Sequence, residues 1–140
     1  MGTWLATYID VLETLSPDNL SRLKACTAEQ IEFKDPFNYT TTQSDFIALM
    51  ADMYSRLDHV HFEVNHSIES ESEAFIEWTF YAESKLTGKF SVVGTSRLKS
   101  DQTGRVVQHF DYWDGSTLME KIPLIGFFIK RLRNRLSHQE

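Results

Sequence analysis

The chain has 140 residues, a length typical of one domain, and its composition of 41% hydrophobic and 24% charged residues excludes disordered and fibrous proteins. The formal net charge of −6 argues against a nucleic-acid partner, which would favour a basic surface. Cys26 is the only cysteine, so no intrachain disulfide can form. Together with an N-terminus that does not resemble a secretory signal, this predicts a cytoplasmic protein.

Helical periodicity dominates the first part of the chain. From Thr3 to Leu15, apolar residues recur every three or four positions, which predicts an amphipathic helix. Ser16-Pro17 is expected to begin a short second helix, since serine caps helices and proline is favoured at the first helical position. A short strand is predicted at Ile31 to Lys34, closed by Asp35-Pro36, and a third helix follows at Phe46 to Leu57.

After Asp58 the apolar period changes from 3.6 to 2. Alternation predicts four long strands, at His61–Ser70, Ala74–Ser84, Lys89–Lys99 and Arg105–Trp113. Short links between them predict an antiparallel meander, and the first strand is expected to turn Phe62, Val64, His66 and Ile68 to one face. The fold class is therefore α+β: a curved antiparallel sheet wrapped around the N-terminal helices, forming a cone with an internal pocket. Gly94, in mid-strand, is a candidate bend point.

The C-terminal segment differs in charge from the rest of the chain. Residues 1–116, the predicted cone, hold nine Lys or Arg against eighteen Asp or Glu, whereas residues 117–140 hold five against two. The tail is predicted to be a basic amphipathic helix of the same domain, docked on the acidic body or on a partner chain. Binding of 117–136 to a membrane surface is the alternative, which is not favoured.

One strand carries an unusual polar pair. On Arg105–Trp113, Val107, His109, Asp111 and Trp113 share one face, and Val106, Gln108, Phe110 and Tyr112 share the other. Alternation alone leaves open which face points into the cone. If His109 and Asp111 point inward, they form a pair suited to acid–base chemistry at the end of a pocket.

Three short segments resemble the nuclear transport factor 2-like superfamily, in particular its ketosteroid isomerase and SnoaL-like polyketide cyclase branches. Tyr8-Ile9-Asp10 is similar to the isomerase segment with the oxyanion-hole tyrosine, and Glu32 to Phe37 is similar to the segment with the general-base aspartate. Gly104 to Trp113 is similar to the last strand, in which a tryptophan lines the pocket and, in SnoaL-like sequences, an aspartate is the acid or base. The resemblance implies an inward-facing His109–Asp111 pair.

The resemblance implies a set of site residues and one departure. The implied catalytic residues are Tyr8, Asp35, His109 and Asp111, and the implied ligand-binding residues are Phe37, Trp78, Phe80, Val92 and Trp113. Where the isomerases carry a second, carboxylic oxyanion donor, this chain reads Val93-Gly94-Thr95-Ser96 and offers only hydroxyls, which argues against true steroid isomerase activity. No metal site and no cofactor are expected, because the histidines lack converging partners and no glycine-rich phosphate loop is present.

Three functions remain in competition. The first is an acid–base isomerase or cyclase acting on a small apolar carbonyl compound, and the second is a non-catalytic binding module with the same pocket. The third is an interaction protein that uses the open sheet face or the basic helix. A homodimer is predicted, because the face that carries Glu77, Thr79 and Tyr81 on one strand and Val93, Thr95 and Arg97 on the next mixes apolar and polar side chains.

Overall fold

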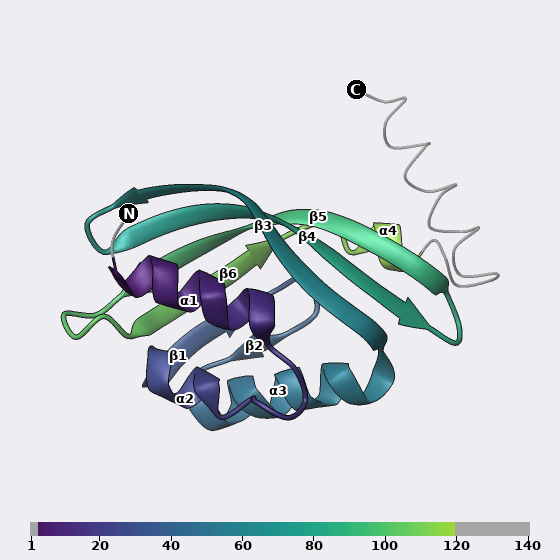
Figure 1. Cartoon of the computed structure of the whole chain (residues 1–140), viewed down its shortest axis with the longest axis horizontal. Coiled ribbons are helices and arrows are strands. Elements are labelled where there is room, and N and C mark those ends of the chain that lie inside the picture. Colours follow the sequence, from purple (N-terminus) through teal and green to yellow (C-terminus); the bar gives the residue numbers. More distant parts are fainter. Residues whose placement is uncertain (1–2, 120–140) are drawn as a thin grey trace.

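The computed structural model describes residues 3–119 and contains three N-terminal helices and a six-stranded sheet (Figure 1). Helix α1 is Thr3–Thr14, α2 is Arg22–Cys26 and α3 is Gln43–Arg56. The predicted second helix begins at Arg22 and not at Pro17, because Ser16 and Asn19 form a turn in which the Ser16 backbone N–H donates to Asn19 Oδ1 at 2.7 Å. Helix α4, Ser116–Met119, lies where the C-terminal helix was predicted to start, and residues 120–140, over which that prediction extends, lie outside the described residues.

The sheet has the order β2-β1-β6-β5-β4-β3 and is curved but not closed, with the helices on its concave side (Figure 1). The strand bounds are β1 Thr27–Lys34, β2 Tyr39–Thr40, β3 Asp58–Ser70, β4 Glu73–Ser84, β5 Gly88–Ser100 and β6 Val106–Tyr112. The antiparallel meander β3-β4-β5-β6 and the α+β class are confirmed. The strand before α3 is longer than predicted, and a two-residue strand follows it where a loop was expected.

Strands β1 and β6 lie side by side and run parallel, a pairing that the sequence did not predict. Their register joins Glu32 to Gln108, Phe33 to His109 and Lys34 to Phe110. The pairing places the end of the first strand beside the end of the last one. It therefore brings together the two segments that carry the predicted acidic site residues.

A β-bulge corrects the predicted faces of the first long strand. Val64 lies opposite Trp78, but His66, two residues on, lies opposite Glu77, so the register shifts by one between them. A shift of one residue exchanges the two faces of a strand. His66 and Ile68 are consequently exposed, with Ile68 77% accessible, and the prediction that they face the core is wrong.

The core lies between the concave face of the sheet and the three helices. Helix α1 contributes Leu5 and Tyr8, α2 contributes Leu23 and α3 contributes Phe46, all at most 1% exposed. The sheet contributes Trp78 and other inward residues: Ile31, Phe33, Ala74, Ile76, Leu98 and Val106. Within the described chain, these side chains fill the concave side on which the internal pocket was expected.

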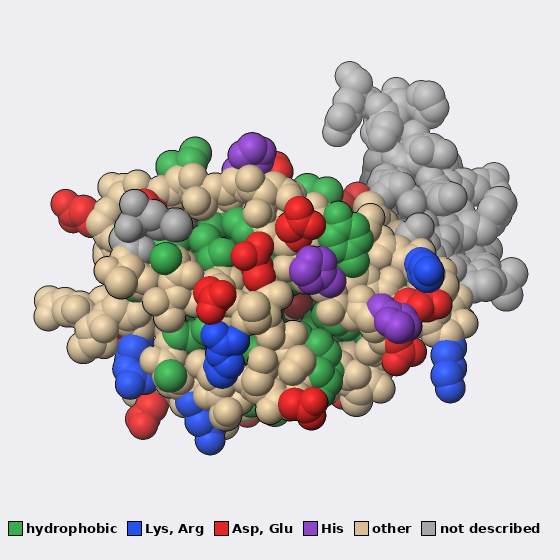
Figure 2. Space-filling model, viewed as in Figure 1, with side chains coloured by type: hydrophobic (Ala, Val, Ile, Leu, Met, Phe, Trp, Pro, Cys, Tyr) green, Lys and Arg blue, Asp and Glu red, His purple; other side chains and the backbone are tan. Residues whose placement is uncertain are grey.

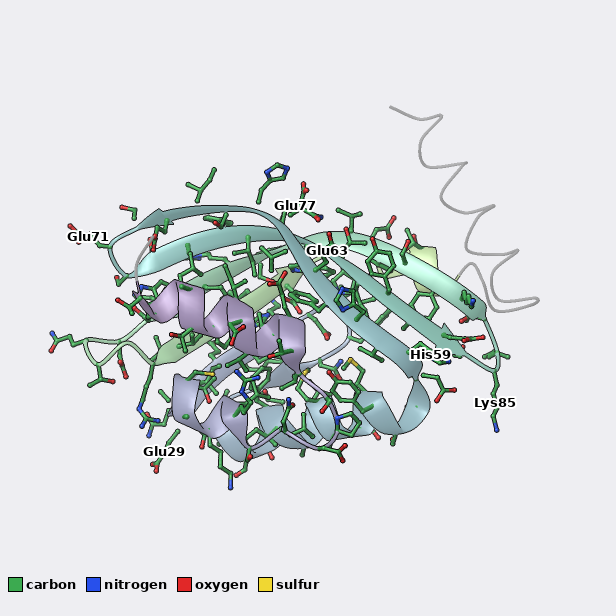
Figure 3. The ribbon with its side chains drawn as sticks, in the orientation of Figure 1. Glu29, His59, Glu63, Glu71, Glu77 and Lys85 are labelled. Carbon is green, nitrogen blue, oxygen red and sulfur yellow. The ribbon has the colours of Figure 1, made fainter. Side chains whose placement is uncertain are left out.

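Charged side chains are spread over the face shown in Figure 2, and acidic groups there do not gather into a single patch. Figure 3 shows Glu71 at the β3–β4 turn and Lys85 at the β4–β5 turn, at opposite ends of the sheet. Among residues 3–119, no helix is both long enough and apolar enough to span a membrane.

Candidate active site

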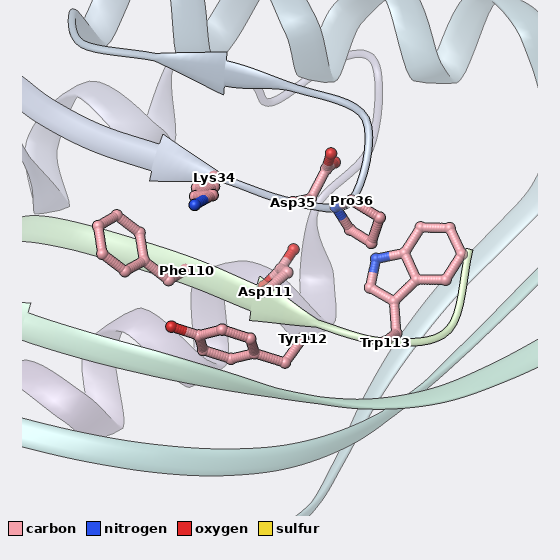
Figure 4. A pocket seen from close by; sticks show the side chains of 7 residues that line it. All are labelled: Lys34, Asp35, Pro36, Phe110, Asp111, Tyr112 and Trp113. Atoms are coloured by element: carbon pink, nitrogen blue, oxygen red, sulfur yellow. The ribbon is translucent and has the colours of Figure 1, made fainter.

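A shallow cleft opens where β1 and β6 separate at their carboxyl ends (Figure 4). The parallel pairing ends at Lys34 and Phe110, because Asp35 donates its backbone N–H to Asn38 O at 3.0 Å and Pro36 has no N–H to donate. The cleft has a volume of about 230 Å³. Its lining comes from the two strand ends: Lys34, Asp35 and Pro36 from one, and Phe110, Asp111, Tyr112 and Trp113 from the other.

Asp35 and Asp111, the two predicted acidic residues, line this cleft: Asp35 directly follows β1, and Asp111 lies on the neighbouring strand β6. The carboxylate of Asp35 is engaged by its own turn: Oδ1 accepts from the backbone N–H of Phe37 at 2.8 Å and of Asn38 at 2.7 Å. The Asn38 side-chain amide donates to both Asp35 oxygens, at 3.1 and 3.2 Å. Asp35 therefore holds the strand-ending turn in place as well as lining the cleft.

The face of β6 that alternation left open is settled by burial: His109 and Asp111 point to the concave side. His109 lies among the rings of Tyr8, Phe33 and Phe46, with ring centroids 5.2 to 5.9 Å apart. Its side chain is 5% exposed, whereas that of Asp111 is 17% exposed. Of this pair, Asp111 is the member that lines the cleft, and His109 lies behind it.

A hydrogen-bonded chain joins the first helix to the last strand. The Tyr8 hydroxyl lies 2.6 Å from His109 Nδ1, and His109 Nε2 lies 2.7 Å from Asp111 Oδ1. Burial raises the pKa of Tyr8 well above its usual range, with smaller contributions from Cys26 and Asp111. The phenol therefore keeps its proton. Tyr8 is fully buried and is not among the residues that line the cleft.

A second arm of the hydrogen-bond network, formed by Trp78 and Ser96, reaches Asp111 from the neighbouring strands. Ser96 lies directly opposite Asp111 in the β5–β6 register, and its hydroxyl donates to Asp111 Oδ1 at 2.5 Å. Trp78 on β4 donates its indole N–H to Ser96 Oγ at 2.8 Å. The sequence pointed to Ser96 only as a hydroxyl where the isomerases carry an acid.

The residues predicted to bind a ligand fall into two groups. Trp113 lines the cleft, and the edge of Phe37, which is 55% exposed, packs against its ring at a centroid distance of 5.6 Å. Trp78 is part of the core, and Phe80 and Val92 pack against it. The sequence analysis missed Lys34, Pro36, Phe110 and Tyr112 as lining residues, because only the β1–β6 pairing brings them together. Within residues 3–119, no three His, Cys, Asp or Glu side chains are placed to hold a metal ion.

The model of the SnoaL-like domain family matches residues 8–109, from the tyrosine of α1 to the histidine of β6. The chain belongs to the SnoaL-like family. No curated protein matches its sequence.

Solved structures share the fold of this SnoaL-like chain at low sequence identity. A hypothetical protein with a ketosteroid isomerase-like fold from Catenulispora acidiphila, in complex with trimethylamine, is 14% identical, with a TM-score of 0.74 over 89% of this chain and 95% of its own. A nuclear transport factor 2-like protein of unknown function from Burkholderia pseudomallei is also 14% identical, with a TM-score of 0.77 over 88% and 99%. A candidate SnoaL-like polyketide cyclase from Shewanella putrefaciens is 14% identical, with a TM-score of 0.74 over 86% of this chain and 96% of its own.

Proposed function

We propose that this SnoaL-like protein is an acid–base enzyme that moves a proton on a small, largely apolar carbonyl compound bound in the β1–β6 cleft, as in isomerisation or cyclisation. The observation that carries the proposal is the position of Asp111. Its carboxylate lines the cleft, and its Oδ1 is held by His109 and Ser96. A carboxylate fixed at the wall of an apolar cleft is suited to act as a general base.

In this mechanism Asp111 removes a proton from the carbon next to the substrate carbonyl. The C–H electron pair becomes the carbon–carbon double bond of an enolate, and the carbonyl π electrons move to the oxygen. Returning the proton to a different carbon completes an isomerisation. In a cyclisation the enolate carbon attacks a second carbonyl, whose π electrons move to its oxygen, and that oxygen takes the proton back from Asp111. Lys34 also lines the cleft, but its register partner is Phe110, so it extends from the face of the sheet opposite Asp111. The Tyr8 hydroxyl, expected from the resemblance to stabilise the enolate oxygen, is bonded to His109 instead.

The lining also supports the class of substrate. Pro36, Phe110 and Trp113 give the cleft apolar walls that suit a hydrocarbon ring. Its volume of about 230 Å³ is below the roughly 300–1,000 Å³ of pockets for drug-sized ligands. The cleft accordingly holds a one- or two-ring compound, or the reacting end of a larger one.

The test is deuterium exchange at the α-carbons of a bicyclic ketone, 2-tetralone, in D2O, followed by proton NMR. The wild-type protein is expected to accelerate exchange, and Asp111→Asn to lower the acceleration by about 10²–10⁴-fold, the usual contribution of a general base. Asp101→Asn, in an exposed turn, is the matched control and keeps the wild-type rate. Exchange at the buffer rate with the wild-type protein rules out this activity on ketones.

A non-catalytic module that binds organic amines is the second candidate. It is favoured by the trimethylamine held by the Catenulispora relative, and by Trp113, Asp35 and Asp111, which line the same cleft. An aromatic face and carboxylates together attract an alkylammonium group. Choline and its neutral carbon analogue 3,3-dimethylbutan-1-ol separate the two functions by calorimetry. Tighter binding of choline, lost in Asp111→Asn and unaccompanied by ketone exchange, supports the binding module.

A homodimer formed through the outer face of the sheet completes the proposal. Phe75, Tyr81 and Val93 are 51%, 41% and 60% exposed on that face, away from the helices. Exposed apolar groups on one sheet face are typical of an interface between copies of a chain. Sedimentation at micromolar concentration is expected to give a dimer, and Val93→Lys a monomer. The lone cysteine supports a reducing, cytoplasmic setting for this dimer.

A further inference from the structure

The two carboxylate oxygens of Asp111 are in different environments. Oδ1 accepts two hydrogen bonds, from Ser96 Oγ at 2.5 Å and from His109 Nε2 at 2.7 Å. Within residues 3–119, no group donates a hydrogen bond to Oδ2. Because Asp111 lines the cleft, Oδ2 is the oxygen left for a ligand.

The two hydrogen-bond partners of His109 fix the position of its proton. The carboxylate of Asp111 can only accept, so the proton of the neutral ring is on Nε2, which donates to Asp111 Oδ1 at 2.7 Å, and Nδ1 has no hydrogen. The Tyr8 hydroxyl, which keeps its proton, then donates to Nδ1 at 2.6 Å. This tautomer is assigned from the partners of the two nitrogens.

The donor and the acceptor of each hydrogen bond in the second arm are also fixed by the chemistry of the groups. An indole N–H can only donate, so Trp78 Nε1 occupies an acceptor position of the Ser96 hydroxyl at 2.8 Å. The Ser96 proton is then free to point at Asp111 Oδ1, directly across the β5–β6 pair. Trp78 and Ser96 are 3% and 0% exposed, so water does not compete for these bonds.

We propose that Tyr8, Ser96 and Trp78 are positioning residues. Tyr8 acts through His109, and Trp78 acts through Ser96, so that two hydrogen bonds hold Asp111 Oδ1 and Oδ2 faces the substrate. Rotation of the carboxylate would exchange its oxygens, and it would break two hydrogen bonds to a charged acceptor in a buried site. The base is consequently one defined oxygen. The catalytic part of this proposal rests on the proposed function, whereas the arrangement of protons does not.

The proton arrangement is tested by NMR of protein labelled with ¹⁵N in its histidine rings. The wild-type His109 is expected to show a hydrogen on Nε2 and none on Nδ1 at pH 8. Tyr8→Phe removes the donor to Nδ1 and is expected to shift the ¹⁵N signal of Nδ1 toward that of a nitrogen that accepts no hydrogen bond, while Nε2 keeps its hydrogen. Tyr54→Phe is the matched control, since the Tyr54 hydroxyl donates to Leu15 O at 3.1 Å, outside the network. A hydrogen on Nδ1 in the wild type, or an Nδ1 signal that is unchanged in Tyr8→Phe, overturns the proposal.

The second arm is tested on ketone exchange. Ser96→Ala and Trp78→Phe are expected to lower kcat by about 10- to 100-fold with KM within twofold, because a base displaced from its productive geometry slows the step without removing the cleft. Ser96→Thr keeps the hydroxyl and is expected to restore much of the rate. The controls are Ser100→Ala, a buried serine on the same face of β5, and Trp4→Phe, which loses an exposed bond to Glu71 O.

The outcomes separate the two proposals. Equal losses in the controls, or a loss confined to KM, overturn the positioning role of Ser96 and Trp78. If the wild-type protein exchanges no ketone, the proposed function fails, and the tautomer of His109 still decides the proton arrangement. Circular dichroism and unfolding curves identify a variant that does not fold, in which case Trp78→Phe, which keeps an aromatic ring in the core, replaces Ser96→Ala.

Discussion

The indole of Trp78 lies directly over Gly94, its partner across the β4–β5 pair. A Cβ at position 94 would meet Trp78 Cη2 at 2.6 Å and Trp113 Cβ at 3.0 Å. The sequence suggested that this glycine bends the strand, and the structure shows a second reason for a glycine at this position. It leaves room for a tryptophan whose N–H reaches Ser96.

Gly94→Ala is therefore expected to destabilise the protein by about 1–3 kcal/mol, the usual cost of overpacking a core. Urea unfolding measures the change. Thr95→Ala, at the next position but on the outer face, is the control and is expected to stay within about 0.5 kcal/mol of wild type. Equal stability of Gly94→Ala and wild type would show that Trp78 can move aside at little cost.

Replacement by asparagine is expected to slow ketone exchange much less at Asp35 than at Asp111. Asp35→Asn keeps an oxygen that can accept from the backbone N–H groups of Phe37 and Asn38, so the turn survives. Ketone exchange is expected to fall less than tenfold, against the much larger loss in Asp111→Asn. Exchange rates of both variants, measured side by side, provide the check. A larger loss in Asp35→Asn would make Asp35 the base.

The thiol of Cys26 is expected to react slowly with alkylating reagents in the folded protein. Burial raises its pKa from 9.0 to about 11, against the lowering influence of its backbone hydrogen bond, Arg22 and Arg105. Because the thiolate is the reactive form, alkylation by iodoacetamide at pH 8 is expected to be slow in the native state and fast in urea. Mass spectrometry of timed samples measures both rates, and equal rates would contradict the burial of the thiol.

The same shift sets the sign of a pH effect on stability. The unfolded thiol ionises near pH 9, whereas the native thiol stays protonated until about pH 11. The contribution of Cys26 is thus full below pH 9 and is lost as the pH rises through 11. Comparison of wild type with Cys26→Ala over this range isolates it, because the other groups are common to both.

The N-cap of α3 is a separate test of local structure. Thr42 Oγ1 accepts a hydrogen bond from the Asp45 backbone N–H at 3.1 Å. Thr42→Ala is expected to cost about 1 kcal/mol of unfolding free energy, as is usual when a cap is lost. The exposed neighbour Thr41 is the control, and Thr41→Ala is expected to have little effect. Thermal unfolding of the two variants compares them directly.

The sequence predicted the meander because β4 and β5 alternate cleanly, and inward residues such as Ile76, Trp78 and Leu98 are buried as expected. It could not predict the faces of β3 beyond Val64, since the bulge there has no proline or glycine to mark it. On β6, both faces carry aromatic residues, so alternation could not choose between them. The choice is made by Tyr8, Phe33 and Phe46, which enclose His109 from distant parts of the chain.

The candidate site was predicted in part for a similar reason. Tyr8, His109 and Asp111 do lie in one hydrogen-bonded chain, and Asp35 lines the same cleft as Asp111. The place of the cleft was not predictable, because it depends on β1 ending beside β6. The parallel pairing of β1 with β6 brings together residues about 76 positions apart, such as Glu32 and Gln108.

The bond between Tyr8 and His109 joins residues 101 positions apart, and β6 is the last strand along the described part of the chain. Nearly the whole domain must therefore be synthesised before these two groups can meet. Closing so long a loop carries an entropic cost that local helices and hairpins do not have, so the contact belongs among the slow events of folding. A fragment ending before β6 would contain helices and hairpins but would lack the wall of the cleft that β6 supplies. Recovery of ketone exchange after dilution from urea would therefore follow completion of the fold and not the early formation of helices.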